Sequence, residues 1–410
     1  MSDNYRTSVG LSLGTTSVSI AVLHQHNEDQ PEIMAFDRVS CRFLRDGVIV
    51  NLEALQDAVN LCKKNIQCVL KASFSNTTIN LCGVPLKQED WESSLVFKRK
   101  REITRRHLSA LQINHCHAND DSLQLIHNTP VSYTLDAQSG IASPIGMAGK
   151  ELKAHLQQIY APAKTVECVL HALNRCGFTI TNILVDPLAS AESLLTNDER
   201  DMGIWILDIG GRVMQLARIK GKRADIIPYV MPGSDLVNSD IAIGLHTTIK
   251  DAERIKIEHG RALTELASND INVQIPPLGG GPVQNPITQH RLAEIIKPRM
   301  EELLELAART ISDFSGTDQE SWGIVLTGGG SVLPGTQELA ESILGLRVIK
   351  GHLRNVSTAL DLPPVPLCAS PVGLALHGLK GRTRSAWTKS GNSFIKHSFK
   401  NIIKWFGGGS

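Results

Sequence analysis

Aromatic residues are scarce in this chain of 410 residues, because Phe, Trp and Tyr together make up only 4%. An excess of one charge is also absent, since 42 Lys and Arg residues are balanced by 41 Asp and Glu residues, a formal net charge of +1. The whole molecule therefore has no general attraction to nucleic acid or to an anionic surface, and a charged partner needs a local patch. No apolar run reaches the roughly 18 residues that a membrane-spanning helix needs.

The eight cysteines are too scattered for a standard metal or redox motif. No Cys-x-x-Cys pair occurs, and the run His115-Cys116-His117 has no second ligand pair at zinc-site spacing. We therefore expect free thiols in a reducing cytosol and no metal site, with a solvated loop at this run in preference to metal binding. The polar first residues, which lead straight into a strand, do not fit a secretory signal.

Two segments share the order strand, glycine turn, strand. In residues 9–23 apolar residues alternate on both sides of Gly14-Thr15-Thr16, which predicts a two-stranded hairpin. Residues 204–219 repeat this order around Gly210-Gly211. The repeat predicts two related halves that face each other across a cleft, and the chain is long enough for such a bilobed molecule.

The segments between these hairpins show helical spacing or strand-to-helix transitions. Asn51 is the expected N-cap of one helix, and Pro298 is expected to kink or break another. The predicted helical segments are 52–62, 165–178, 188–195, 236–263, 290–311 and 336–345.

A shift in composition between residues 86 and 160 predicts a small inserted α/β subdomain. Its basic run KRKREITRRHL, residues 98–108, is interpreted as the solvated face of a helix. Nucleic-acid contact is the alternative, but no aromatic residues are interleaved for base stacking.

A third glycine turn, Gly328-Gly329-Gly330, follows a strand and leads into a helix N-terminus. Glycines let the backbone approach a phosphate, and consecutive amides form a nest for an anion. One such turn is weak evidence, whereas three in this order favour a phosphate-containing ligand over purely structural turns.

The C-terminal tail predicts an amphipathic helix at residues 393–406 after a polar, flexible linker at 380–392. Aromatic and aliphatic side chains would enter the headgroup region of a membrane while lysines on the flank meet anionic lipid. The alternative is a helix docked on the protein itself, which the linker disfavours. The membrane-facing residues are Phe394, Ile395, Lys396, Phe399, Lys400, Ile402, Ile403, Lys404, Trp405 and Phe406.

The order of these motifs resembles that of the actin-like superfamily of sugar kinases, actin and chaperone ATPases. Within it, the chain is similar nearly end to end to the FtsA family of bacterial cell-division proteins. The motifs DAERIK and IKPR, taken with the amphipathic tail, are specific to that family; the others are GVIVNLEAL, SPIGMAGKEL, LASAESLLTNDER, LDIGG, SDIAIGL, IVLTGGGSVLPG and SPVGLAL.

The resemblance implies an α/β, actin-like (ribonuclease-H-like) fold of two lobes with an FtsA-type inserted subdomain. The expected divisions are the first lobe at 1–85 and 161–204, the inserted subdomain at 86–160, the second lobe with a partner-binding subdomain at 205–379, the linker at 380–392 and the membrane helix at 393–406.

A nucleotide site is also implied by the resemblance. Two phosphate loops would hold the phosphates, Glu253 and Lys256 would reach the ribose and adenine, and the third glycine turn would pass beneath the adenosine. From the residues alone, Glu253 and Lys256 are an exposed pair one helical turn apart. The implied residues are Gly14, Thr15, Thr16, Asp208, Gly210, Gly211, Gly233, Glu253, Lys256, Gly328, Gly329 and Gly330.

The chain departs from the superfamily pattern where carboxylates are expected. Ser12 replaces an acidic residue of the first turn, and Arg212, Val213 and Gln215 replace the glycine, threonine and aspartate of DIGGGT-x-D. Lost carboxylates weaken metal binding, and metal ions neutralise charge in phosphoryl transfer. We therefore expect weak or degenerate binding of ATP with Mg²⁺, no catalytic residues, and a scaffold in place of an enzyme.

Arg212 itself has three interpretations. Its guanidinium could occupy the place of the γ-phosphate, pair with a phosphate and partly replace the metal, or lie on the surface of a degenerate turn.

The resemblance implies an adaptor that tethers the FtsZ ring to the cytoplasmic membrane, peripherally on its cytoplasmic side at the division septum. The FtsZ C-terminal peptide would bind the helix AEIIKPRMEEL, with Arg299 meeting a peptide carboxylate. The other expected partners are further copies of the chain in filaments, anionic lipid and later divisome proteins, but no nucleic acid. The alternatives are a working actin-like ATPase, a pilus-assembly relative of the same fold that should have no amphipathic tail, and a small-molecule kinase.

Overall fold

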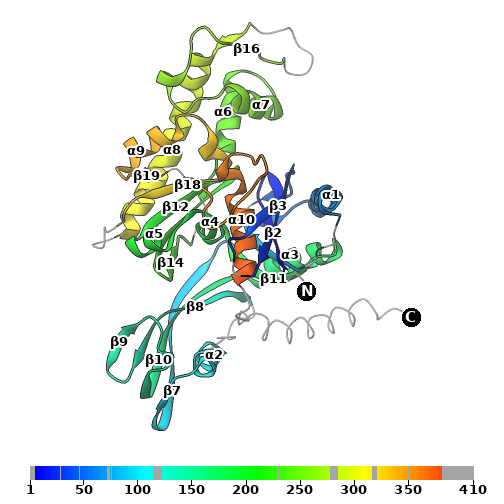
Figure 1. Ribbon diagram of the computed structural model, residues 1–410. Helices are drawn as coiled ribbons and strands as arrows, with labels where there is room; N and C mark the ends of the chain where they lie inside the picture. The colour runs from blue at the N-terminus through cyan, green and yellow to red at the C-terminus, as the bar shows by residue number, and fades with distance from the viewer. Residues whose placement is uncertain are drawn as a thin grey trace.

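The computed structural model describes residues 5–27, 29–45, 47–71, 74, 76–113, 122–228, 231–277, 285–315, 321–349 and 351–380. In it, two α/β lobes pack against each other and a β-rich subdomain extends away from them (Figure 1). The predicted amphipathic helix, the run 115–117 and the linker beyond Lys380 lie outside the described residues. Within the described part, no helix is both long and apolar enough to cross a membrane.

The first lobe is built on a five-stranded sheet of order β11-β6-β1-β2-β3. The predicted hairpin is confirmed: β1 and β2 run antiparallel around the first glycine turn, and β1 pairs in parallel with β6. The strands are β1 Tyr5–Leu13, β2 Ser17–His26, β3 Glu32–Ser40, β6 Asn76–Leu81 and β11 Thr179–Val185. A small pair, β4 Leu44–Arg45 and β5 Val48–Ile49, follows β3.

Helices cover both faces of this sheet. On one face lie α1 (Leu52–Leu70) and α3 (Ala163–Arg175), and Asn51 caps α1 as predicted by accepting the Ala54 amide at 2.9 Å. On the other face lie α4 (Asp186–Leu194) and α10 (Val365–Lys380).

The second lobe repeats the same plan in a sheet of order β14-β13-β12-β18-β19, with β15 beside β13. The strands β12 and β13 run antiparallel around the second glycine turn, and β12 pairs in parallel with β18. The predicted internal repeat is therefore confirmed. Its strands are β12 Ile204–Ile209, β13 Val213–Lys220, β14 Arg223–Ile226, β15 Met231–Pro232, β18 Ile324–Thr327 and β19 Val348–Ile349.

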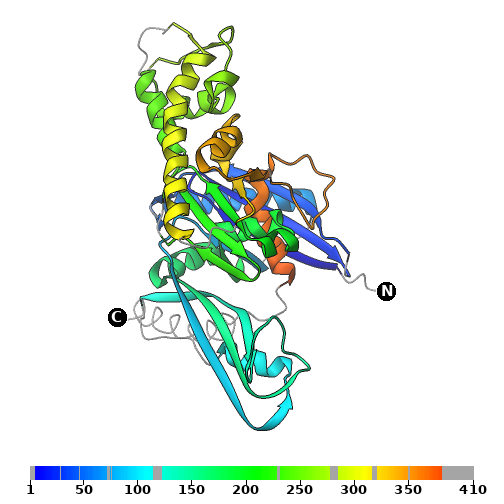
Figure 2. The same cartoon turned by 90° about the vertical axis from the view of Figure 1, so that its left-hand side faces the viewer.

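Helices α5 (Asn197–Met202), α8 (Gln289–Ser315) and α9 (Thr336–Leu344) belong to this lobe. Helix α8 is one continuous helix that contains Pro298, so the prediction of a break there is wrong (Figure 2). The helix survives because its apolar face, including Ile296 and Met300 on either side of the proline, is buried in the lobe's core.

The far end of the second lobe holds α6 (Asp235–Gly244), α7 (Ile249–His259) and a short pair, β16 (Asn272–Val273) and β17 (Ile287–Thr288). The helical pattern predicted over 236–263 is thus two helices. The second helix starts anew because Thr248 caps it by accepting the Asp251 amide at 3.0 Å.

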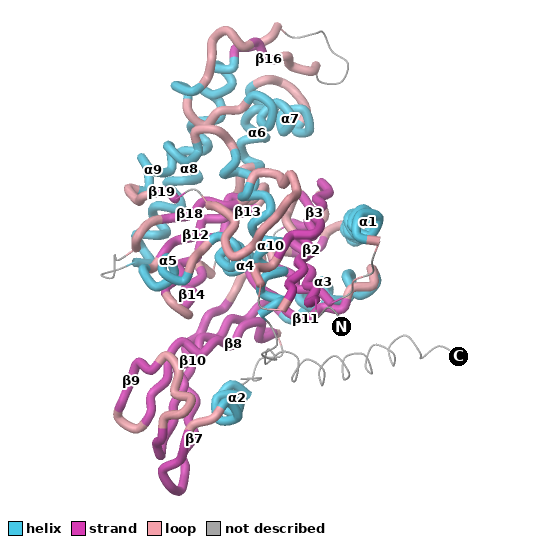
Figure 3. Tube along the Cα trace, viewed as in Figure 1, coloured by secondary structure: helices cyan, strands magenta, loops and turns pink. Residues whose placement is uncertain are grey.

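The inserted subdomain is a four-stranded antiparallel sheet of order β7-β10-β8-β9 with α2 over one face (Figure 3). It has a core of its own, in which Ile103, Leu111 and Leu152 are fully buried. Its elements are β7 Lys87–Glu102, α2 Arg105–Ile113, β8 Leu123–Leu135, β9 Gln138–Ile141 and β10 Ala148–Pro162.

The basic run 98–108 does not form a single helical face, so that interpretation is corrected. Its first five residues belong to β7, and only the part from Arg105 onward is helical. Strand pairing prevails because Leu95 and Phe97 alternate into the subdomain core and Ile103 is buried where the strand ends.

Helix α10 corrects the expected division of the chain, which assigned residues up to 379 to the second lobe. The helix packs instead on the first-lobe sheet, where Val372 and Leu376 join Leu23 and Ile33 in one buried cluster. It lies so close to α4 that a Cβ on Gly373 would collide with the Ala189 carbonyl oxygen. The chain therefore returns to its first lobe at the end of the fold.

This close approach predicts the effect of Gly373→Ala. Alanine ordinarily stabilises a helix interior by about 1 kcal/mol relative to glycine. Here the added methyl meets backbone that cannot rotate away, so overpacking prevails and we expect a net loss of roughly 2 kcal/mol. Thermal unfolding measures the change.

A matched control is Gly244→Ala in α6, where the added methyl would lie 3.3 Å from the flexible side chain of Ile295. We expect an unchanged or slightly higher melting temperature for the control. Equal melting temperatures for the two variants would contradict the close packing of α10 on α4.

Candidate functional site

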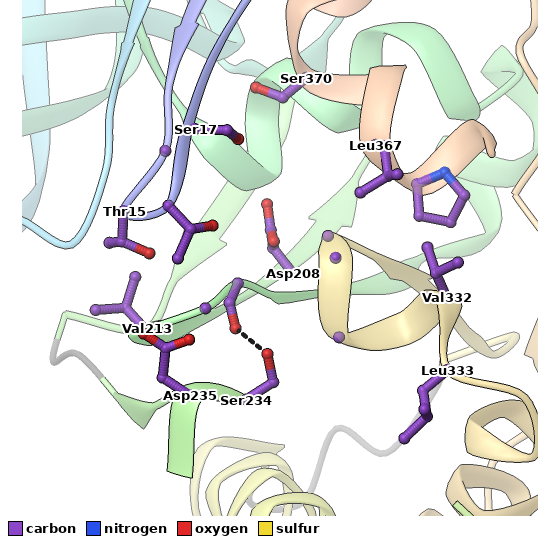
Figure 4. A pocket seen from close by; sticks show the side chains of 18 of the residues that line it. Thr15, Ser17, Asp208, Val213, Ser234, Asp235, Val332, Leu333, Leu367 and Ser370 are labelled. Atoms are coloured by element: carbon purple, nitrogen blue, oxygen red, sulfur yellow. Dashed lines mark hydrogen bonds between the residues drawn. The ribbon is translucent and has the colours of Figure 1, made fainter. Parts of the chain in front are cut away.

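A cavity of about 290 Å³ opens between the two lobes, at the ends of the two repeated hairpins. The turns after β1, β12 and β18 all reach it, as do α6, α7 and the start of α10. Figure 4 shows Thr15 from the first lobe and Asp208 and Asp235 from the second around the same space. Of the residues that sequence predicts for a nucleotide site, all but Gly233 line this cavity.

The cavity has a polar side and an apolar side. Hydroxyl, carboxyl and backbone groups gather near Thr15, Asp208 and Asp235, whereas Val332 and Leu367 lie opposite them (Figure 4). Such a shape matches a ligand with phosphates at one end and a flat apolar base at the other.

The two phosphate-loop candidates touch each other. The Arg212 amide donates a hydrogen bond to Thr15 Oγ1 at 3.0 Å. A Cβ on Gly211 would collide with the Thr16 methyl group, so only glycine permits this approach. The two turns are therefore in direct contact across the two lobes.

Gly233 supports the second loop from outside the cavity lining. Its amide donates to the Arg212 carbonyl at 2.9 Å, and Ser234 Oγ donates to the Gly210 carbonyl at 3.0 Å. The next residue, Asp235, begins α6 and carries its carboxylate into the cavity. Gly233 thus acts through the loop and not on a ligand directly.

The third turn needs glycine at its first position. Gly328 has a φ of +82°, and a Cβ there would collide with the Asp208 carboxylate and the Ile209 carbonyl. The turn can therefore pass close under the end of β12, where it continues into a single 3₁₀ turn at Gly329–Val332.

Asp186 is a site residue that the sequence analysis missed. It is the first residue of α4 and lines the cavity, where it accepts hydrogen bonds from Asn80 Nδ2 at 2.5 Å and Ser370 Oγ at 3.1 Å. The hydroxyl oxygens of Ser12 and Ser370 lie 3.3 Å apart in the same hydrogen-bond network. The strand-to-helix stretch VDPLAS, with an acid directly before its proline, was the signal that could have revealed it.

Asp186 and Asp208 are both buried, and burial raises the pKa of each carboxyl group. The charge of Asp186 raises the pKa of Asp208 further. The three side-chain hydrogen bonds to Asp186, from Asn80, Cys82 and Ser370, oppose this change in part. Asp208 has no side-chain hydrogen bond to any other described residue. Its carboxyl group thus faces the cavity as an unpartnered ligand group.

Arg38 and Lys256 line the cavity and Arg42 lies at its edge, whereas Arg212 is not among the lining residues. The interpretations in which Arg212 occupies the γ-phosphate place or pairs with a phosphate are therefore not supported. Arg38 and Lys256 line the cavity instead, and Arg38 Nε donates to Ser17 Oγ at 3.2 Å. Burial lowers the pKa of Lys256, while Asp235 and Glu253 oppose the change.

Arg42 joins the lobes at the edge of the cavity. It donates to Asp235 Oδ2 at 3.1 Å and to Glu253 Oε2 at 2.9 Å. Glu253 is therefore already engaged by the first lobe, and a ribose hydroxyl would share or replace this partner.

Two family models match the chain. The model described as cell division protein FtsA matches residues 205–363, and the model for the SHS2 domain inserted in FtsA matches residues 89–160. The FtsA of Pseudomonas aeruginosa is 29% identical over 94% of this chain and 93% of its own length. The FtsA of Escherichia coli K12 is 28% identical over 95% and 98%.

The chain belongs to the FtsA family of cell-division proteins.

Solved structures agree with the actin-like fold expected for FtsA. The PilM–PilN type IV pilus biogenesis complex matches with a TM-score of 0.62, at 17% identity, over 91% of this chain and 98% of the other. MreB5 of Spiroplasma citri bound to AMPPNP matches with a TM-score of 0.50, at 16% identity, over 97% and 98%. At these identities the likeness concerns the fold alone.

The FtsA resemblance also singled out Arg299, which lies on α8 and is not among the residues that line the cavity. Its guanidinium pairs with the Asp240 carboxylate at 2.6 Å and 3.1 Å, and it also pairs with Glu302. Its neighbour Lys297 lies 3.5 Å from Glu265. Arg299 and Lys297 thus both pair with acidic side chains of the chain itself.

The buried acids predict that Asp208→Asn stabilises the protein in a pH-dependent way. When folding raises the pKa of a carboxyl group, the protein loses stability as the pH rises from the pKa of the unfolded state, about 4, through the pKa of the folded state. The amide removes that loss, so the gain should be absent near pH 4 and on the order of 1–3 kcal/mol at pH 8.

Thermal unfolding at pH 4.5 and pH 8, chosen as roughly the two ends of that window, measures the difference. Asp361→Asn changes an exposed aspartate that forms no ion pair or side-chain hydrogen bond with another described residue; it serves as the control and should change little at either pH. A gain of equal size at both pH values would mean that the raised pKa of Asp208 is not its source.

Proposed function

We propose that this FtsA-family protein is an adaptor that tethers the FtsZ ring to the cytoplasmic face of the membrane and helps assemble the divisome. The observation that carries the proposal is the likeness to FtsA proteins over more than nine tenths of the chain, which includes both lobes and the inserted subdomain. The amphipathic pattern of residues 393–406 supports a peripheral attachment.

Binding of a nucleotide in the cavity is part of this proposal. An actin-like structure, MreB5 of Spiroplasma citri, is described with AMPPNP bound. In this chain the amides of the touching glycine turns would hold phosphates, and Lys256 and Glu253 would hold the ribose and base end. The unpartnered Asp208, with Asp186 beside it, fits the one or two carboxylates that Mg²⁺ takes beside substrate phosphates. When bound, the metal would neutralise phosphate charge.

A working ATPase is the second candidate, because one observation favours it. Although Ser12 and Gln215 replace two expected acids, Asp186 and Asp208 keep two carboxyl groups in the cavity. A carboxyl group with raised pKa is suited to accept a proton near neutral pH. Release of phosphate from ATP, measured for the chain and for Asp186→Asn, separates this candidate from a binding-only scaffold.

The proposed FtsZ contact would use the exposed side of α8. A peptide carboxylate that binds Arg299 would have to share or replace Asp240, since both of its oxygens now accept from Arg299. A bidentate pair with little exposure is not displaced at low cost, so apolar contacts of the peptide would have to contribute as well.

Nucleotide affinity should fall about 10- to 100-fold in Lys256→Gln, because a buried charged hydrogen bond contributes about 1.5–3 kcal/mol. Titration calorimetry with ATP, with and without Mg²⁺, measures this. The matched control Lys250→Gln changes an exposed lysine at the start of the same helix and should bind like the unchanged protein. Failure of the unchanged protein to bind ATP would end the nucleotide part of the proposal.

Membrane attachment should depend on the apolar side of the tail. In co-sedimentation with phosphatidylglycerol vesicles, Ile402→Glu should release most of the full-length chain, because a charge would enter the headgroup boundary. His397→Glu adds the same charge on the polar side of that helical pattern and should retain most binding.

An FtsZ C-terminal peptide added to the vesicles should pellet with the unchanged chain and with the control variant, but not with Ile402→Glu. If Ile402→Glu pellets as well as His397→Glu, the tail is not the anchor. Such a result would favour the pilus-assembly alternative.

A further inference from the structure

The end of the inserted subdomain carries a cluster of six basic residues. We call this cluster the basic tip: Lys98, Arg99, Lys100, Arg101, Arg105 and Arg106. All six side chains are exposed, and Glu102 is the only acid among residues 98–106. The tip is the outer end of a strand of 16 residues whose inner end is held to the second lobe by Arg223–Asp90 hydrogen bonds of 3.0 Å. It therefore lies well away from the cavity.

The fold leaves most of this positive charge uncompensated, although Lys100 lies near enough to Asp136 to help lower the pKa of that carboxyl group. None of the six residues forms an ion pair within 4 Å to another described residue. Arg105 and Arg106 stand in the first turn of α2, which contains no acid. Cations are unfavourable there because the helix dipole places positive charge at this end. A cluster that opposes local stability in this way points to an external negative partner.

Strand geometry pushes the tip outward. Along β10, Gly149 pairs with Arg101 while Glu151, two residues on, pairs with Val96. Residues 97–100 are thus an expanded bulge with a single residue opposite them, and they project from the ladder. Arg101 lies over the Phe97 ring at 5.3 Å, which holds the base of the bulge.

Apolar side chains accompany the charge. Val96 is 76% exposed beside the bulge, and Ile145 is 46% exposed in the loop that bonds to Ile103 through Gly146 and Met147. Basic residues with a few insertable apolar side chains are typical of surfaces that meet anionic membranes. The surface is less suited to nucleic acid, which needs an exposed aromatic ring for base stacking. Phe97 is only half-exposed, and Arg101 and His107 pack against its ring.

The last described helix, α10, ends on the side of the molecule that bears the inserted subdomain. Helix α10 ends at Lys380 near the base of the inserted subdomain (Figures 1 and 2). His377, in its last turn, interacts electrostatically with His127 of β8.

The maximum span of the linker can be compared with the length of β7 from its base to the basic tip. From Asp90 to Val96, where the bulge begins, the regular strand extends about 20 Å. The twelve residues 381–392 can span up to about 40 Å. A helix that begins at 393 can thus reach the level of the tip.

We propose that the basic tip binds the anionic headgroups of the membrane as a second contact beside the C-terminal helix. This inference rests on the proposed membrane attachment for its setting, but it concerns separate residues. Two contacts on one subdomain side hold the lobes at a defined orientation to the membrane, whereas one flexible tail leaves them free to rotate.

The test uses the full chain with vesicles of equal parts phosphatidylcholine and phosphatidylglycerol. The tip variant carries Lys98→Gln, Arg99→Gln and Lys100→Gln. The matched control carries Lys250→Gln, Arg291→Gln and Arg309→Gln, three exposed residues of the second lobe. We expect vesicle affinity of the tip variant to fall at least about tenfold at low salt, and that of the control less than about twofold. Unchanged thermal unfolding shows that each variant is folded.

A local readout comes from Val96→Trp, whose emission should shift to the blue on anionic vesicles and not on pure phosphatidylcholine. Tip and control variants that bind vesicles equally would overturn the proposal. So would a tip variant that loses only binding to duplex DNA, or only self-association measured by sedimentation without lipid.

Combination with Ile402→Glu separates the two membrane contacts. If Ile402→Glu releases the chain while the tip variant binds normally, the tail attachment stands and the tip inference fails. If Ile402→Glu binds normally while the tip variant is released, the tip inference stands and the tail attachment fails.

Discussion

Close contact between two glycine turns is the constraint on which the rest of this structure depends. Gly211 approaches Thr16 within a distance that no side chain at 211 would allow, and the Arg212 amide bonds to Thr15. These contacts bring the ends of β1 and β12 to one place. The cavity exists because the two hairpins diverge from this contact, and the third turn and α10 close it from the other side.

The cavity brings together the ionisable side chains of Asp186, Asp208, Arg38 and Lys256, none of which forms an ion pair within 4 Å to another described residue. Asp186 and Asp208 come from different lobes, and their pKa values rise because they are buried and repel each other. Arg38 and Lys256 face the same space without ion pairs to described residues. A ligand that carries both phosphates and a metal would satisfy groups of both signs. Such a ligand would contact both lobes, because Asp186 and Arg38 belong to the first lobe and Asp208 and Lys256 to the second.

Local patterns predicted much of the secondary structure. Alternating apolar residues and glycine turns identified both hairpins, and Asn51 marked the start of α1. Two errors share one cause. The basic run around Lys98 became strand, and α8 continued through Pro298, because burial of neighbouring apolar residues outweighed local preference. Asp186 was missed because nothing in its neighbourhood shows that Asn80 and Ser370 approach it from distant elements.

The sequence by itself determined the two-lobed plan, the glycine turns and the family, because these follow from short-range periodicity and from motifs. Only the tertiary structure decided which groups share the cavity. It brought Asp186 to Asp208, left Arg212 out of the cavity lining, held Arg299 against Asp240, and returned α10 to the first lobe. The physical reason is that these are contacts between segments far apart in the chain, and their geometry depends on how whole layers pack.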